Sequence, residues 1–182
     1  TYRDFAPNHV LAANILPEKT ITAYSVSKNC GLAGMRVGSL VGPKDFIADV
    51  RGTMVSDLGI NVVGQRAASA ALKTKPEWLP ELLETARRNQ EIIKETVDKI
   101  DGAFLPVYPS AASMMIIDIS EHNANPQDVQ DKLLYEHDIF VRAGNYVSAR
   151  FGENFIRVSF SIPTEEVERF AEAFPKVMQE LT

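Results

Sequence analysis

The sequence contains little of the chemistry that would hold a metal ion or a disulfide. Cys30 is the only cysteine among the 182 residues, so no disulfide can form within one chain. The three histidines, His9, His122 and His137, are scattered and lack the spacing of metal ligands. We therefore expect no metal site, and a lone cysteine fits best with a reducing cytoplasm.

Long apolar runs and an excess of basic residues are also absent. No run of about 18 apolar residues occurs, which argues against a membrane-spanning helix. The net charge of −5 argues against a surface that binds nucleic acid in general. We expect neither nucleic acid nor a membrane as a partner. The apolar content of 45%, with 24% charged residues, is that of a globular protein with a buried core.

The most informative segment, residues 25–38, reads Ser-Val-Ser-Lys-Asn-Cys-Gly-Leu-Ala-Gly-Met-Arg-Val-Gly. It places Lys28 among small residues, eight positions before Arg36. A deprotonated lysine amine attacks an aldehyde, and a planar guanidinium binds a phosphate with two parallel hydrogen bonds. The segment also supplies hydroxyls and glycines that suit a phosphate: Ser25, Ser27, Gly31 and Gly34. The alternative for such a spacing is a solvated lysine and a surface arginine on a Ser/Gly loop.

The pattern Ser25-x-Ser27-Lys28-x-x-Gly31-Leu32-Ala33-Gly34-x-Arg36-x-Gly38 resembles the lysine motif of the fold-type I aminotransferases, which use pyridoxal 5'-phosphate. The resemblance implies that Lys28 is the catalytic residue and bonds covalently to the cofactor aldehyde. It also implies that the cofactor phosphate is bound by Ser25, Ser27 and Arg36.

Two further segments resemble the same family. Phe155-Ile156-Arg157-Val158-Ser159-Phe160-Ser161 resembles the strand that presents an arginine to the substrate's α-carboxylate, which makes Arg157 the expected substrate-binding residue. Tyr2-Arg3-Asp4-Phe5 resembles the end of an Asp-x-x-Tyr motif, in which Tyr2 would bind the cofactor's ring oxygen. The alternative for Tyr2 is a tyrosine packed at a strand end. We expect Arg142 and Arg150 to be surface residues.

The resemblance implies pyridoxal-phosphate-dependent transfer of an amino group between an α-amino acid and a 2-oxo acid, by a homodimer. The same motif also serves carbon–sulfur β-lyases and related synthases. An inactive cofactor-binding domain fused to a regulator is the alternative outside the enzymes. A requirement for a 2-oxo acid acceptor would separate the transaminase from the lyase. The side chain of the preferred amino acid does not follow from the sequence.

The expected fold is α/β, with three parts. Residues 1–75 would form the C-terminal part of a large cofactor-binding domain with a mainly parallel sheet, residues 76–100 a connecting helix, and residues 101–182 a small C-terminal α/β domain. Members of the family are longer, so we expect this chain to be the C-terminal part of an enzyme. The aspartate that pairs with the cofactor's ring nitrogen would then precede Thr1, and the chain alone would be inactive.

Local patterns predict the individual elements. Branched and aromatic residues indicate strands, while Pro43 followed by Asp45 indicates a helix start. The predicted strands are 20–24, 35–41, 113–119, 139–142 and 155–161, and the predicted helices are those after Pro43 and at 62–72, 78–100, 126–137 and 164–181. One segment, Gly59–Gln65, departs from the family, because members often have a Ser/Thr-rich sequence there that contacts the partner subunit's phosphate.

Overall fold

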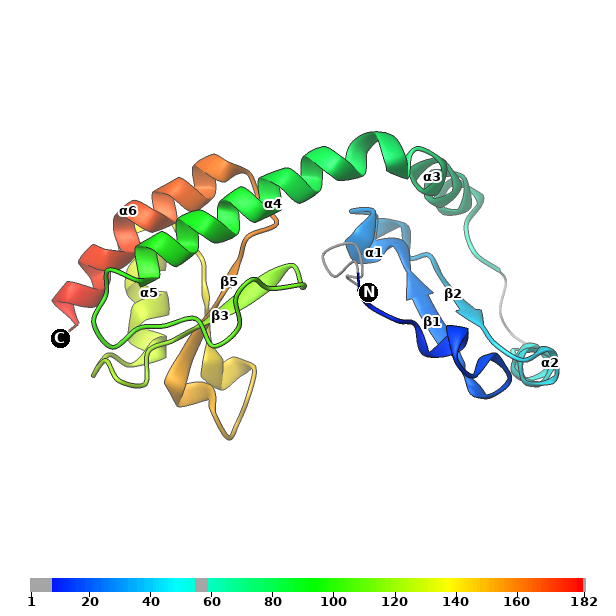
Figure 1. Cartoon of the computed structure of the whole chain (residues 1–182), viewed down its shortest axis with the longest axis horizontal. Helices are drawn as coiled ribbons and strands as arrows, with labels where there is room; N and C mark the ends of the chain where they lie inside the picture. The colour runs from blue at the N-terminus through cyan, green and yellow to red at the C-terminus, as the bar shows by residue number, and fades with distance from the viewer. Residues whose placement is uncertain (1–7, 55–58, 182) are drawn as a thin grey trace. The chain divides into compact units, whose positions relative to one another are not determined.

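The computed structural model describes residues 8–54 and 59–181, which belong to two units (Figure 1). The first unit is Thr1–Pro80 and the second is Glu81–Thr182. The structure mixes helices and sheets in both units, which confirms the predicted α/β class. None of the described helices has both the length and the apolar character needed to cross a lipid bilayer.

The first unit contains a two-stranded sheet and several helices. Its strands are β1 (Thr22–Ser25) and β2 (Gly38–Val41), and its main helices are α1 (Val26–Asn29), α2 (Lys44–Thr53) and α3 (Val62–Lys73). Short 3₁₀ turns lie at Ala12–Asn14, Pro17–Lys19 and Ala33–Met35. The helices predicted after Pro43 and at 62–72 are confirmed.

The pairing of β1 with β2 is antiparallel, and so is every other strand pair among the described residues. The sequence predicted mainly parallel pairing. Between β1 and β2 the chain has only residues 26–37, which contain a single helical turn and a 3₁₀ turn. A parallel crossover takes at least a dozen residues and usually a full helix, whereas this short connection holds only single turns, and the chain folds back as an antiparallel pair.

Strand β2 begins later than predicted. The sequence predicted a strand from Met35, but β2 starts at Gly38. Arg36 adopts the left-handed conformation, with φ 54° and ψ 43°, which is incompatible with an extended strand. The backbone therefore turns at Arg36 and becomes extended only after it.

The first unit buries little of its apolar surface. Three residues of β1 and all of β2 are exposed. Among its described apolar residues only Val26 and Ala68 are buried, while Leu40, Val41 and Val63 are exposed. The described part of this unit therefore has no core of ordinary size.

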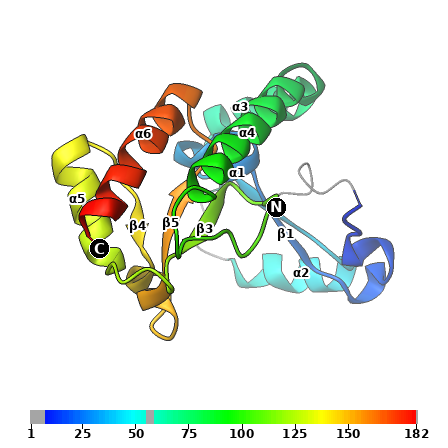
Figure 2. The same ribbon diagram turned by 60° about the vertical axis from the view of Figure 1, so that its left-hand side comes forward.

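The second unit is a three-stranded antiparallel sheet in the order β3-β5-β4, packed with helices (Figure 2). Its elements are α4 (Lys75–Val97), which begins in the first unit, β3 (Met114–Asp118), α5 (Pro126–His137), β4 (Arg142–Ala143), β5 (Phe155–Ser159) and α6 (Thr164–Glu180). All six correspond to predicted elements, with shifted ends in several.

Most of the core of this unit lies on one face of the sheet. Along β5, Ile156 and Val158 are buried, as are Met115 and Ile117 along β3. Successive side chains of a strand point to opposite faces, so these residues share the face that the helices cover. Beside Val158, the helices contribute Ile93, Val167 and Phe170. On the other face Ile116 is 38% exposed and Arg157 is half-buried.

Strand β4 is shorter than predicted. The sequence predicted a strand over 139–142, but the ladder with β5 contains only Arg142 and Ala143. The Ile139 N–H still donates to the Leu133 carbonyl of α5, at 3.0 Å, and Asp138 caps that helix in the left-handed conformation. Asp138 and Ile139 are therefore hydrogen-bonded to the end of α5, and the chain joins the sheet only at Arg142.

The connection from β4 to β5 is closely packed at two glycines. A Cβ atom added to Gly144 would lie 2.5 Å from the Gly152 carbonyl oxygen, and one added to Gly152 would lie 2.3 Å from the Asn145 Cα. Neither position can carry a side chain without movement of the backbone. The amide of Ala143 is held at 2.9 Å by the Gln130 side chain of α5. These contacts fix the backbone next to Arg142.

Two buried amides join α4 to the sheet. The Asn89 side chain is fully buried and donates to the carbonyls of Phe160 and Ile162, at 2.9 and 2.8 Å. The Gln90 side chain accepts from the Ser110 N–H at 2.7 Å and donates to the Ser110 carbonyl at 3.2 Å. Buried backbone groups outside the ladders are thereby satisfied.

An ion-pair cluster joins α5 to α6 at the surface. The Lys132 ammonium lies 2.8 Å from the carboxylates of both Glu136 and Glu180. The hydrogen bond from the Lys132 ammonium lowers the pKa of the Glu180 carboxyl below the usual range. Both glutamates are about half exposed, so the cluster fixes geometry more than it stabilises the fold.

We predict that Asn89→Ala destabilises the second unit by about 2–4 kcal/mol, because two carbonyls lose their buried amide donor and a cavity forms. Urea denaturation followed by circular dichroism measures the change. Asn123→Ala is the control, since Asn123 is exposed. If Asn89→Ala lowers the free energy of unfolding no more than Asn123→Ala does, the Asn89 amide does not stabilise the segment at Phe160 and Ile162.

Candidate functional site

Lys28 lies on α1, directly after β1, and its side chain is exposed. The preceding Val26 anchors this turn, with 3% of its surface exposed. Its N–H donates to the Val37 carbonyl at 3.4 Å, and its carbonyl accepts from the N–H groups of Cys30 and Leu32, both at 3.3 Å. The loop that carries Lys28 is therefore closed on itself, and the lysine projects from a fixed turn.

The hydroxyls of Ser25 and Ser27 lie together at the start of α1. Ser25 is the N-cap, and its Oγ accepts from the Ser27 N–H at 3.2 Å. The two hydroxyl oxygens are 3.0 Å apart, in hydrogen-bond contact. The predicted phosphate-binding serines therefore form one small polar group beside Lys28.

Arg36 is brought to the same end of the hairpin by the strand register. Ser25 pairs with Gly38 in the ladder, and Arg36 lies two residues before Gly38. Its guanidinium Nη1 donates to the Ala33 carbonyl at 2.8 Å. Within the described ranges, neither Arg36 nor Lys28 forms an ion pair with a carboxylate. Both cations are thus available to an anion.

Glycines give this loop its shape. A Cβ atom on Gly38 would lie 2.9 Å from the Tyr24 carbonyl oxygen, so the close pairing of β1 and β2 at this point needs a glycine. Gly31 has φ +65°, which glycine adopts without strain. Among the described residues, and apart from the adjacent ones in the chain, no atom lies within 4 Å of a Cβ built on Gly31 or Gly34, so both glycines face open space.

The residues of this loop fit pyridoxal phosphate. The exposed amine of Lys28 can bond to an aldehyde, while the hydroxyl pair and the Arg36 guanidinium are suitable donors to a phosphate. All four residues belong to one hairpin end, and the space beside its glycines is open. The motif therefore places these donors on one end of the hairpin.

Asn61, in the segment 59–65 that departs from the family pattern, supports the turn at Arg36. Asn61 caps α3, accepting from the Gly64 N–H at 2.6 Å, and its Nδ2 donates to the Met35 carbonyl at 3.3 Å. A Cβ atom on Gly64 would lie 2.9 Å from that same carbonyl oxygen. The sequence interpretation missed this role of Asn61, because it depends on a contact between segments distant in sequence.

Arg157 lies in the second unit, at the centre of β5. Its register partners are Ile116 on β3 and Arg142 on β4. Its side chain is half-buried and makes no ion pair within residues 8–54 and 59–181. An arginine in this state can bind a carboxylate, and that role stays a prediction. Tyr2 lies outside the described residues.

Arg142 and Arg150 differ from each other, although both were expected at the surface. Arg150 is exposed, with its guanidinium 4.9 Å from the ring centre of Phe151. Arg142 is half-buried and lies beside Arg157 in the ladder. The sequence offered no signal for this, because the pairing of β4 with β5 follows only from the fold.

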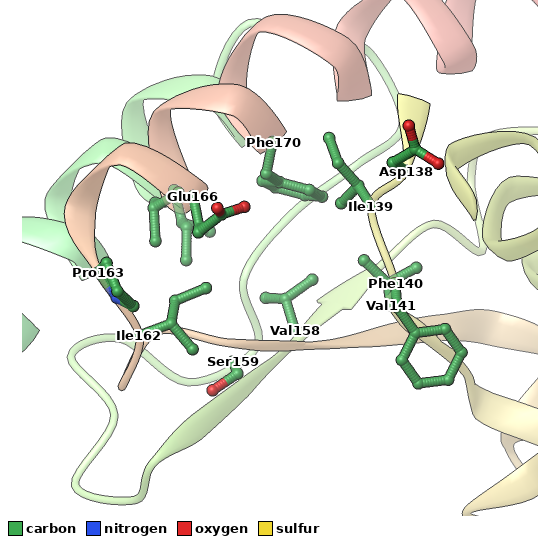
Figure 3. Close-up of a pocket in the computed structure, with 12 residues that line it drawn as sticks. Asp138, Ile139, Phe140, Val141, Val158, Ser159, Ile162, Pro163, Glu166 and Phe170 are labelled. Carbon is green, nitrogen blue, oxygen red and sulfur yellow. The ribbon is translucent and has the colours of Figure 1, made fainter. Parts of the chain in front are cut away.

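A pocket of about 260 Å³ lies on the helix-covered side of the sheet (Figure 3). Its walls are mostly apolar and include Val158, Ile162 and Phe170. None of the predicted site residues lines it, and Arg157 points to the opposite face from Val158. This pocket is therefore not part of the predicted site.

Comparison with known proteins gives curated relatives that are about one-third identical or less. An arginine–pyruvate transaminase of Pseudomonas aeruginosa is 29% identical over 143 residues, which are 77% of this chain and 36% of that protein. An aromatic amino acid aminotransferase of Corynebacterium diphtheriae is 32% identical over 136 residues, covering 74% of this chain and 36% of that protein. The chain thus spans little more than a third of the length of these relatives.

Solved structures share the fold. Histidinol-phosphate aminotransferase from Sinorhizobium meliloti, in complex with pyridoxal-5'-phosphate, has a TM-score of 0.76 and 25% identity, covering 91% of this chain and 42% of that one. Cystalysin from Treponema denticola, which contains the same cofactor, has a TM-score of 0.82 at 20% identity, covering 96% of this chain and 45% of that one. At that identity, the likeness to cystalysin shows the fold alone.

A family described as aminotransferase class I and II matches residues 1–174, nearly the whole chain. This match agrees with the lysine hairpin at residues 25–38 and with the shared fold. The chain belongs to the class I and II aminotransferases.

Proposed function

We propose that the complete protein transfers an amino group between an α-amino acid and a 2-oxo acid, with pyridoxal phosphate held on Lys28. The observation that supports this most directly is that one end of the hairpin carries Lys28, the hydroxyl pair of Ser25 and Ser27, and Arg36. Turnover that requires a 2-oxo acid acceptor would support the proposal. Release of ammonia and a 2-oxo acid without any acceptor would favour a lyase instead.

The proposed chemistry assigns each side chain a distinct task. When bound, the cofactor supplies the electron sink for the substrate's α-carbon. Lys28 anchors the cofactor and then, as a free amine, moves the proton at that α-carbon. Ser25, Ser27 and Arg36 hold the phosphate, while Arg157 binds the α-carboxylate with two parallel hydrogen bonds and so orients the reacting carbon.

We predict that reduction with borohydride in the presence of pyridoxal phosphate labels Lys28. The reason is that Lys28 has the hydroxyl pair next to it in the chain and Arg36 at the same end of the hairpin, whereas Lys19 and Lys44 are exposed lysines without such a setting. Peptide mapping by mass spectrometry locates the pyridoxyl group. Lys28→Ala should remove the label, and Lys44→Ala should leave it in place. Equal labelling of Lys19, Lys28 and Lys44 would contradict the assignment.

We predict that Arg36→Ala and Arg157→Ala impair different steps of the complete enzyme. Loss of a charge-assisted, two-bond contact should cost on the order of 2–4 kcal/mol, or about 30- to 1000-fold, in the affected step. Arg36→Ala should raise the dissociation constant of the cofactor, and Arg157→Ala should raise the KM for the amino acid. Arg87→Ala on the exposed side of α4 is the control. Equal weakening of cofactor binding by both variants would refute the separation of roles.

The division into parts also stays a proposal. Residues 1–75 would be the C-terminal part of the large domain, residues 76–100 the connecting helix, and residues 101–182 the small domain. The exposed apolar surface of the first unit supports this, because strands β1 and β2 would be covered by the rest of a large domain. We also propose that the complete protein is a cytoplasmic homodimer. Light scattering would measure its mass in solution and so test the dimer.

We predict that the 182-residue chain by itself does not transfer amino groups. It spans less than half of its relatives, and the aspartate that keeps the cofactor's ring nitrogen protonated would lie in the remaining part. An assay with a panel of amino acids and 2-oxoglutarate, run beside the complete enzyme, measures this. Turnover by the 182-residue chain within tenfold of the complete enzyme would overturn the prediction.

A further inference from the structure

Lys28 lies inside a loop that a side-chain hydrogen bond closes. Asn29, the last residue of α1, donates from its Nδ2 to the hydroxyl oxygen of Tyr24 on β1. The segment between these two residues contains Ser25, Ser27 and Lys28. Helix α1 has only four residues, and a single helical turn is not stable by itself in water. The direction of the Lys28 side chain therefore depends on the bonds that tie this turn to its surroundings.

Tyr24 provides a fixed point for this hydrogen bond. It pairs with Ser39 in the ladder between β1 and β2. Its carbonyl oxygen would lie 2.9 Å from a Cβ atom on Gly38, so the two strands approach each other closely at this point. Successive side chains of a strand point to opposite faces, which places the Tyr24 ring on the other face from the Ser25 hydroxyl. Tyr24 thus holds α1 without occupying the face that carries the proposed phosphate donor.

The hydrogen-bond capacity of the Asn29 amide is only partly used. Its Oδ1 is buried and has no hydrogen-bond partner among the residues that the structure describes. A buried acceptor without a donor costs free energy, and an apolar side chain of similar size would avoid that cost. Stability alone therefore does not favour asparagine at position 29. What the asparagine adds is a directed bond across the turn that carries Lys28.

We propose that Asn29 and Tyr24 are positioning residues for Lys28. This rests on the proposed function, in which the Lys28 amine bonds to pyridoxal phosphate. The amine adds to the aldehyde carbon, and the aldehyde oxygen leaves as water with the two amine protons. The step needs the amine within reach of that carbon, and the bond between Asn29 and Tyr24 keeps the turn in the arrangement that allows it. Neither residue needs to contact the cofactor for this role.

Binding of two cofactor forms to the cofactor-free complete protein tests the proposal. Pyridoxal 5'-phosphate has the aldehyde, whereas pyridoxamine 5'-phosphate has an amine in its place and cannot bond to Lys28. Fluorescence titration gives a dissociation constant for each. We expect Tyr24→Phe and Asn29→Leu each to weaken binding of pyridoxal phosphate about 3- to 10-fold, the range for one lost hydrogen bond. Binding of pyridoxamine phosphate should weaken less than about twofold, because the Ser27 N–H still donates to the Ser25 hydroxyl.

Two further measurements separate positioning from a purely structural role. The double variant should weaken pyridoxal phosphate binding no more than either single variant, because both changes remove the same bond. Its urea midpoint should equal or exceed that of the parent protein, because the unpaired buried acceptor is also removed. Tyr135→Phe is the matched control, since it removes the hydroxyl of an exposed tyrosine and should change neither dissociation constant. If Asn29→Leu does not fold, Tyr24→Phe alone decides the test.

Equal weakening of both cofactor forms, or of neither, in Tyr24→Phe and Asn29→Leu would overturn the proposal. So would additive losses in the double variant, or a fall in its urea midpoint that parallels the loss of binding. Lys28→Ala distinguishes this proposal from the proposed function. If Lys28→Ala selectively weakens pyridoxal phosphate binding and the other two variants do not, only the positioning role fails. If Lys28→Ala leaves that binding unchanged, Lys28 does not hold the cofactor and the proposed function fails as well.

Discussion

The pairing of Ser25 with Gly38 is the constraint on which the lysine hairpin depends. It closes residues 26–37 into a loop whose two ends carry the hydroxyl pair and Arg36. The hydrogen bond from the Val26 N–H to the Val37 carbonyl extends the closure by one step, and buried Val26 then accepts two further bonds. This pairing therefore places Lys28, the two serines and Arg36 on the same end of the hairpin.

Elements with local signals were predicted well from the sequence. Helix α5 has the predicted bounds, because Asn125 caps its first turn and Pro126 occupies the first helical position. Strand ends were predicted less well, since they depend on backbone conformations without a local signature. The left-handed Arg36 is the clearest example, because a non-glycine residue there gives no warning in the sequence.

The residues of the candidate site also fall into those that a local sequence motif predicts and those that depend on tertiary structure. The lysine motif predicted Ser25, Ser27, Lys28 and Arg36 as site residues because they lie close in sequence, and the structure places all four on one end of the hairpin. Asn61 was missed, since it acts on a segment that only tertiary structure brings near. The register of a short strand such as β4 is set by contacts with α5 and β5, which no local pattern records.

Positions in and near the β4–β5 connection differ in how well they accept a different side chain. Backbone atoms fill the space where side chains at 144 and 152 would be, so these positions admit glycine alone. By contrast, Phe140 and Tyr146 are 57% and 74% exposed, and their replacement would disturb few neighbours. In a directed-evolution library, positions 140, 142 and 146 could therefore be randomised together while positions 144 and 152 are kept as glycine.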